Sequence, residues 1–261
     1  MNRLAALSPR RRMLVIGVAA AVLAVAVIVA IRVLVNGRDT GPKAPQGVPG
    51  TVVLVPGYGG GTSGLRVLAR RLEQEGRTAV VVQLPDGGTG DMERQAQTID
   101  RYVSDAQAAG SPSVDIVGHS AGGVAAHLWA SEYDGVRKAR RIITLGSPHH
   151  GADLAGAGSA LGACPAACDQ LAPGSSLLRR LGDKVGRAPA WMSLWTTHDD
   201  TVGNASSRLT GAVDVELQKV CPGATTGHSG LPSDPRVIGI VLGALGPGPL
   251  AAPRACPSVS S

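Results

Sequence analysis

The sequence contains no phenylalanine, and aromatic side chains make up only 2% of its 261 residues. A hydrophobic core must therefore be built from valine, leucine, isoleucine and alanine. Glycine, in contrast, is plentiful with 36 residues, which indicates many tight turns between regular elements. A chain of this length can hold one sizeable α/β domain with a full core.

The chain also lacks an excess of charge outside its N-terminal region. Its formal net charge is +6, and residues 1–43 hold seven basic residues and one acidic residue. The remaining residues therefore have no net charge. A nucleic-acid-binding protein would carry basic residues on its folded domain. The distribution argues against a nucleic-acid partner, and we take a monomer as the default because no sequence feature addresses assembly.

One long apolar run, residues 13–31, follows three consecutive arginines. It matches the roughly 20 residues that span a bilayer and exceeds the ~7–15 apolar residues of a signal peptide. The arginines favour a cytoplasmic N-terminus. We therefore predict a single-pass anchor over 13–35 in a bacterial-type plasma membrane. Residues 1–12 would be cytoplasmic and the domain extracytoplasmic, the alternative being secretion after signal cleavage.

A Gly- and Pro-rich linker over 36–47 is expected to precede a folded domain over 48–261. Apolar strands alternate with helical patterns in this domain, which predicts an α/β fold. The mostly parallel sheet would have about six strands and helices on both faces. Ligand groups then belong at the carboxyl ends of the strands. The expected strands are 51–55, 78–84, 114–118, 141–145, 191–197 and 211–217, and helices are expected to end near 76, 109, 133 and 245.

Cysteine is scarce, and the four cysteines all lie in the part expected to be exported. An even number there indicates disulfides, although the sequence alone allows three pairings. The compact "CPAAC" unit favours Cys164–Cys168, which leaves Cys221–Cys256 to tie the C-terminal tail to the loop before His228. Neither a C-x-x-C unit nor a paired-histidine spacing occurs, so we expect no metal site.

A serine between two glycines follows the third predicted strand, in Gly118-His119-Ser120-Ala121-Gly122. In a G-x-S-x-G turn, small residues at Gly118 and Gly122 let a sharp bend lift the hydroxyl above the sheet. The helix that follows favours developing negative charge at its N-terminus. The alternative is an ordinary turn with a capping serine. The position between a strand and a helix favours the nucleophile.

A serine hydroxyl needs a base within hydrogen-bonding reach to act as a nucleophile. The segment "TTHDDTV" at 196–202 follows the fifth predicted strand, and "TGHSGLP" at 226–232 precedes the last helix. The order serine, acid, histidine is the one expected for a catalytic triad in this architecture. The acid loop carries two candidates, Asp199 and Asp200.

These segments resemble the α/β-hydrolase superfamily, and within it the small secreted bacterial lipases and esterases of the class 2 type. The likeness covers roughly residues 50–246 and rests on "VLVPGYGG", "VDIVGHSAGG", "ITLGSPHHG", "WTTHDDTV" and "GHSGLPSDPRV". It implies an α/β-hydrolase fold without a large cap domain. The family's D-x-x-V step places the acid at Asp199, with Asp200 as the alternative, and its base histidine corresponds to His228.

The resemblance implies a serine hydrolase that cleaves carboxylic esters of small molecules or lipids without a cofactor. Ser120 would attack the carbonyl, His228 would take its proton and Asp199 would orient the imidazole. Backbone N–H groups of Tyr58 and Ala121 would form the oxyanion hole. The chain departs from many relatives at Pro56, where they carry a histidine.

Two other functions remain open at this point. An acyltransferase acting on lipid or cell-wall acceptors would use the same triad, and a surface-anchored binding protein could keep the fold without its chemistry. The long segment from His149 to about Pro173 has little regular pattern, and residues 151–173 could form a lid or a simple loop. We expect His119 and His149 to have packing or loop-stabilising roles rather than catalytic ones.

Overall fold

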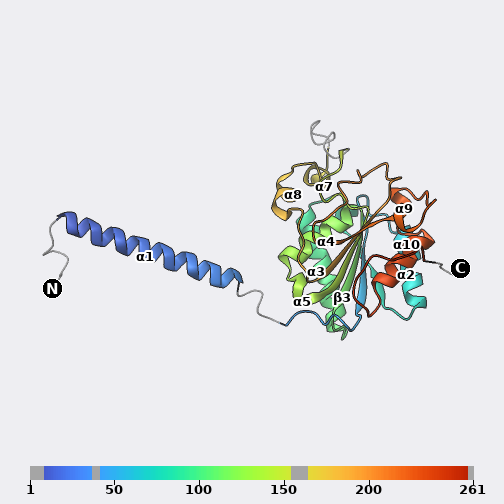
Figure 1. The fold of residues 1–261 in the computed structure, drawn as a ribbon, viewed down its shortest axis with the longest axis horizontal. Helices are drawn as coiled ribbons and strands as arrows, with labels where there is room; N and C mark the ends of the chain where they lie inside the picture. The colour runs from blue at the N-terminus through green and yellow to red at the C-terminus, as the bar shows by residue number, and fades with distance from the viewer. Residues whose placement is uncertain (1–8, 37–41, 154–163, 258–261) are drawn as a thin grey trace. The chain divides into compact units, whose positions relative to one another are not determined.

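The computed structural model describes residues 9–36, 42–153 and 164–257. The chain divides into two units, Met1–Pro42 and Lys43–Ser261. The first contains helix α1 (Pro9–Asn36), and the second contains the sheet (Figure 1). In the described ranges, no helix is both long enough and apolar enough to cross a bilayer, so the predicted span over 13–35 is not found.

The second unit is built on a six-stranded sheet in which all pairs are parallel, as predicted. The strand order is β2-β1-β3-β4-β5-β6. The central strands are apolar on both faces, which is why the sequence shows continuous apolar runs rather than alternation. The strands are β1 (Thr51–Val55), β2 (Ala79–Val81), β3 (Val114–His119), β4 (Ala139–Leu145), β5 (Ala190–Trp195) and β6 (Val213–Glu216).

Helices cover both faces of this sheet (Figure 1). Side chains alternate along β1, so that Val53 packs in the core on the side of α3 and α4, and Leu54 in the core on the side of α2 and α10. The α-helices are α2 (Ser63–Gln74), α3 (Met92–Ala108), α4 (Ala121–Glu132), α5 (Gly135–Lys138), α7 (Ala166–Gln170), α8 (Ser176–Leu181), α9 (Leu217–Val220) and α10 (Pro235–Ala244), with short 3-10 helices η3 (Pro85–Gly88) and η4 (His228–Gly230).

The predicted strands are too long chiefly at the two edges of the sheet. Strand β2 stops at Val81 rather than at residue 84, and β6 stops at Glu216 where α9 begins. An edge strand has one pairing partner, so pairing ends sooner than its apolar pattern suggests. The strands that carry the serine and the acid loop, β3 and β5, lie inside the sheet. The position of β3 agrees with the prediction within one residue, and β5 ends at Trp195 rather than at residue 197.

A buried ion cluster lies at the amino ends of the strands. Asp115 of β3 is fully buried and accepts hydrogen bonds from Arg140 at 2.9 and 2.6 Å and from Arg77 at 2.7 Å. Both arginines also donate to the carbonyl oxygen of Leu245, which follows α10. Guanidinium groups at the C-terminus of a helix satisfy its free carbonyls and oppose its dipole. The cluster thus ties α10 to the sheet.

Candidate active site

Ser120 lies in the sharp turn between β3 and α4, with φ 53° and ψ −129°. A positive φ is rare for a residue with a side chain and is found where the surrounding structure enforces it. A Cβ atom at Gly118 would lie 2.6 Å from the carbonyl oxygen of Gly122, and one at Gly122 would lie 2.4 Å from that of Val55. Both positions therefore exclude any larger residue.

The structure brings the hydroxyl of Ser120 together with two side chains from distant loops. His228 Nε2 lies 2.9 Å from Ser120 Oγ, and His228 Nδ1 lies 2.7 Å from Asp199 Oδ2. His228 is in η4, and Asp199 lies in the loop after β5. The carboxyl ends of neighbouring parallel strands meet at one edge of the sheet. Asp199 and Ser120 therefore reach the imidazole of His228, although they lie 29 and 108 positions before it in the sequence.

The carboxylate of Asp199 is almost completely buried, with 1% of its side chain exposed. Burial alone would raise its pKa. Hydrogen bonds from His228 and from the backbone N–H groups of Val202 and Thr201 outweigh this effect and hold the pKa below its usual value. Asp200, the alternative acid in the sequence, is exposed and accepts from the Thr201 hydroxyl at 3.2 Å.

The two backbone groups expected to form an oxyanion hole lie beside Ser120. A Cβ atom at Gly57 would be only 2.8 Å from Ser120 Cβ, so the turn that continues into Tyr58 packs directly against the serine. Ala121 is the first residue of α4. Among the described residues, neither Tyr58 nor Ala121 uses its N–H in a backbone hydrogen bond. Both groups are therefore available to a ligand.

Two cavities meet at Ser120. One has a volume of about 280 Å³ and is lined mainly by apolar groups, among them Pro148, Leu171 and Val202. The other has a volume of about 350 Å³ and contacts His228 and more polar side chains, including Ser63 and Ser229. The serine hydroxyl thus separates a largely apolar space from a more polar one.

His119, inside the elbow, does not contact the serine hydroxyl. Its Nε2 lies 3.1 Å from the carbonyl oxygen of His228, so it contacts the backbone of the base. Burial, and to a smaller extent the neighbouring His228, lowers the pKa of His119 to about 4. The ring is therefore neutral near pH 7 and can donate to that carbonyl, which agrees with a packing role.

Two further imidazoles lie buried beneath the elbow. His149 is within 3.3 Å of the Thr144 hydroxyl, and its ring packs edge-on against that of His127. Burial lowers the pKa of His127 to about 4 and that of His149 well below its ordinary value. His150 instead contacts the carbonyl oxygen of Arg208 at 3.0 Å. These contacts agree with the loop-stabilising roles expected for this segment.

Both disulfides favoured by the sequence are present, Cys164–Cys168 and Cys221–Cys256. Cys168 lines the apolar cavity beside Ser120. Residues 154–163 of the candidate lid lie outside the described residues. In the part of the chain that the structure describes, no group of three His, Cys, Asp or Glu side chains is placed to hold a metal ion.

The sequence analysis missed two residues that contact the site or its loops. Gly146 follows β4 with φ 56°, and a Cβ atom there would lie 3.0 Å from Asp199 Oδ2 and 3.2 Å from His228 Nδ1. The glycine after the strand in "TLGSP" was the available signal. Gln218 of α9 bridges the loops that carry Asp199 and His228. Its neighbours in the sequence gave no signal.

A family described as "PGAP1-like alpha/beta domain" matches residues 89–161, a segment that contains Ser120. A search of curated proteins finds no match. Among solved structures, Aspergillus fumigatus lipase B superposes with a TM-score of 0.62 at 17% identity, covering 76% of this chain and 52% of that chain. This chain therefore spans about half the length of that lipase.

Two bacterial structures are also similar. Bacillus licheniformis lipase BlEst2 in its propeptide form has a TM-score of 0.61 at 18% identity, covering 82% of this chain and 54% of that chain. The ydeN gene product from B. subtilis has a TM-score of 0.53 at 17% identity, covering 75% of this chain and 98% of that chain. At these identities the likeness shows the fold. The domain has an α/β-hydrolase fold and resembles lipases, as the sequence motifs predict.

Proposed function

We propose that this α/β-hydrolase domain is a serine hydrolase that cleaves carboxylic esters, with Ser120, His228 and Asp199 as its catalytic residues. One observation carries the proposal. A strained serine between a strand and a helix heads a continuous hydrogen-bonded chain, with 2.9 Å between Ser120 and His228 and 2.7 Å between His228 and Asp199. An ordinary capping serine needs neither the strain nor the base.

The first step is the attack of Ser120 Oγ on the carbonyl carbon of the ester. The Asp199 carboxylate accepts the Nδ1–H of His228, which leaves a lone pair on Nε2 to take the serine proton. The lowered pKa of Asp199 keeps it ionised near pH 7, so that it can stabilise the imidazolium that forms. The C–O π electrons of the ester move to oxygen and produce a tetrahedral oxyanion.

The N–H groups of Tyr58 and Ala121 would donate to this oxyanion, and the N-terminus of α4 would add its dipole. When the intermediate collapses, His228 Nε2 gives its proton to the departing alkoxide, which leaves as an alcohol. A water molecule then attacks the acyl-serine by the same route and releases the carboxylic acid. Each step uses groups that already lie within hydrogen-bonding distance of one another.

The two cavities support an ester with an apolar acyl part. The space of about 280 Å³ lined by Pro148, Leu171 and Val202 would hold the acyl chain, because its walls offer it few hydrogen-bonding groups. The more polar space near Ser63 and Ser229 would receive the alcohol part. Lipases and a carboxyl esterase are among the similar structures, which agrees with this substrate class.

We also propose that the domain works outside the cytoplasm. Within the described residues, all four cysteines of the chain are paired in two disulfides. Such bonds form and persist in oxidising compartments and are rare in the cytosol. Alkylation of unreduced protein taken from its natural host should leave both pairs unmodified, and full alkylation would contradict the proposed location.

Labelling with a fluorophosphonate and hydrolysis of a series of p-nitrophenyl esters test the proposed function together. The wild-type chain should be labelled and should release free carboxylic acid, whereas Ser120→Ala should lose both properties. Ser104→Ala, at an exposed position of α3, is the matched control and should behave as wild type. Full turnover by Ser120→Ala, or transfer of the acyl group to an added alcohol in place of hydrolysis, would contradict the proposal.

A further inference from the structure

The proposed acid and base lie on two loops that follow different strands. We call residues 196–199 the acid loop, since it runs from the end of β5 to Asp199, and residues 221–228 the base loop, since it runs from the end of α9 to His228. The Asp199–His228 hydrogen bond depends on how these loops lie against each other. Side chains outside the triad make that connection.

Gln218 of α9 contacts both loops at once. Its Nε2 donates to the Thr196 hydroxyl at 2.8 Å, on the acid loop, and lies 3.1 Å from the carbonyl oxygen of Ala224, on the base loop. Its Oε1 accepts the backbone N–H of Thr197 at 3.0 Å. If the amide were flipped, its NH₂ group would face the N–H of Thr197 and its oxygen would face the carbonyl oxygen of Ala224. These contacts therefore fix the orientation of the amide.

Thr196 provides the second half of the bridge. It is fully buried at the end of β5, and its hydroxyl donates to the carbonyl oxygen of Thr226 on the base loop at 2.8 Å. The hydroxyl oxygen of Thr196 also accepts hydrogen bonds from Gln218 Nε2 and from the backbone N–H of His198. Thr226 is only two positions before His228. One hydroxyl therefore joins the start of the acid loop to the end of the base loop.

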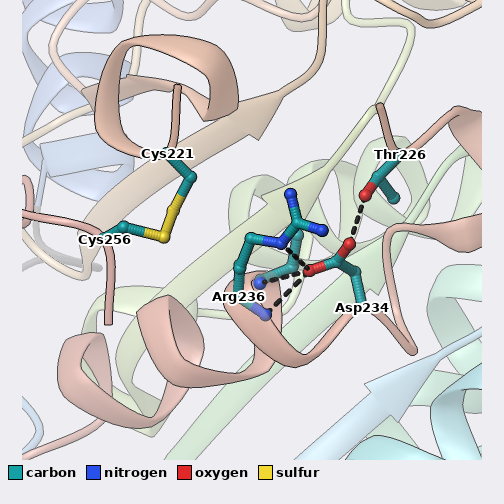
Figure 2. Close-up of a disulfide and its surroundings, with 6 residues drawn as sticks. Cys221, Thr226, Asp234, Arg236 and Cys256 are labelled. Carbon is teal, nitrogen blue, oxygen red and sulfur yellow. Dashed lines mark hydrogen bonds and ion pairs between the residues drawn. A yellow bond between two sulfur atoms is a disulfide. The ribbon is translucent and has the colours of Figure 1, made fainter. Parts of the chain in front are cut away.

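The base loop is also fastened at its outer ends (Figure 2). The disulfide from Cys221 to Cys256 holds the start of the loop to the C-terminal tail. The hydroxyl of Thr226 donates to Asp234, whose carboxylate also caps α10 through the N–H of Arg236 at 2.7 Å. The loop is thus tied to the C-terminal tail at its start and to the N-terminus of α10 near its end, and the bridge through Gln218 and Thr196 connects it to the acid loop.

We infer that Gln218 and Thr196 are positioning residues that hold His228 in register with Asp199. The inference rests on the proposed function for its kinetic test. Neither side chain lines the two cavities at Ser120, so neither is placed to bind substrate. Their loss should loosen the acid–base pair without changing what the site binds. A misplacement of about 1 Å near reacting groups can cost about 100-fold in rate, and loosening should cost less.

Gln218→Met removes the amide at similar length, and Thr196→Val removes the hydroxyl at similar volume. Each should lower kcat about tenfold, with KM changed less than about twofold, because ground-state binding is untouched. Thr196→Ser keeps the hydroxyl and should restore most of the wild-type kcat. Gln74→Met is the matched control, since Gln74 is exposed at the end of α2 and contacts Arg71; its kcat should be that of wild type.

The double variant distinguishes one shared bridge from two independent contacts. Thr196→Val with Gln218→Met should lose little more than either single variant, because both break the same connection. A loss equal to the product of the two single losses would overturn the inference. So would an unchanged kcat in both single variants, or a failure of Thr196→Ser to recover activity in a folded protein.

A proton NMR measurement tests the geometry without turnover. The His228 Nδ1 proton, shared with Asp199, should give a far-downfield resonance in the wild type and in Gln74→Met. That resonance should be lost or exchange-broadened in Gln218→Met and in Thr196→Val, and kept in Thr196→Ser. If the wild-type chain hydrolyses no ester, the proposed function fails, but the resonance still decides the positioning role. A resonance unaffected in Gln218→Met would overturn that role.

Discussion

The two ends of the sheet each contain a buried aspartate with several hydrogen-bond donors, but the donors differ. Asp115 at the amino ends is held by the guanidinium groups of Arg77 and Arg140. Asp199 at the carboxyl ends is held by an imidazole and two backbone N–H groups. A guanidinium does not give up its proton in proteins, whereas an imidazole does so near neutral pH. The same side chain thus serves cohesion at one end and, in the proposed mechanism, proton transfer at the other.

The difference follows from the kind of side chain that each aspartate binds. At the amino ends, the cations also bind the last carbonyl oxygens of α10, so removing the carboxylate would leave positive charge buried. At the carboxyl ends, the carboxylate binds the single imidazole of His228 and orients it. The two ends should therefore respond differently to one chemical change, aspartate to asparagine.

The largest effect is expected at the carboxyl ends. Asp199→Asn should lower kcat about 10⁴-fold, equivalent to about 5.5 kcal/mol, because an amide donor at this position favours the imidazole tautomer that cannot accept the serine proton. Steady-state ester kinetics provide the measurement. Asp200→Asn is the matched control on the same loop and should retain wild-type kcat, since Asp200 is exposed. Equal losses in the two variants would refute the assignment of Asp199.

The same substitution at the amino ends should act on stability instead. Asp115→Asn should lower the free energy of unfolding by about 3–5 kcal/mol, because two guanidinium groups lose their buried counter-charge. Urea denaturation would measure the loss, and the kcat of the remaining folded protein should be unchanged. A kcat that fell as far as in Asp199→Asn would show that the two ends are not functionally separate.

A smaller effect is expected from two buried imidazoles as the pH falls. Burial lowers the pKa of His127 to about 4 from an ordinary value of 6.5, and lowers that of His149 well below this ordinary value. Between pH 6.5 and 4 the unfolded chain binds protons that the folded chain does not. Stability is therefore full above pH 6.5 and falls as the pH drops, by up to about 1.4 kcal/mol per pH unit for each imidazole.

Urea denaturation at several pH values would measure this slope. His127→Gln should reduce the slope of stability against pH by the amount that corresponds to about one bound proton. His198→Gln, a change at an exposed imidazole, should leave the slope as in the wild type. An identical slope in wild type and His127→Gln would rule out a buried neutral His127 as its source.

Much of the fold could be predicted from the sequence because its signals are local. A strand with both faces buried must be apolar throughout, so the inner strands were found to within two residues of their observed ends. The edge strands β2 and β6 were predicted too long, because pairing depends on neighbours that the pattern of one segment does not include. Gln218 carries no local signal, since its importance arises from two loops that meet it in space. Gly146 is visible in the sequence as a glycine after a strand, but its contact with Asp199 and His228 is not.

The sequence by itself determined the alternation of strands and helices, the glycine-flanked turn at Ser120 and the chain order of serine, acid and base. These features depend on the size and polarity of residues close together in the chain. Only the tertiary structure decided that Asp199 rather than Asp200 faces His228, and that Gln218 spans the two loops. Adjacent carboxylates have the same local chemistry, and only the packing of the sheet, α9 and the loops decides which one is buried against the imidazole.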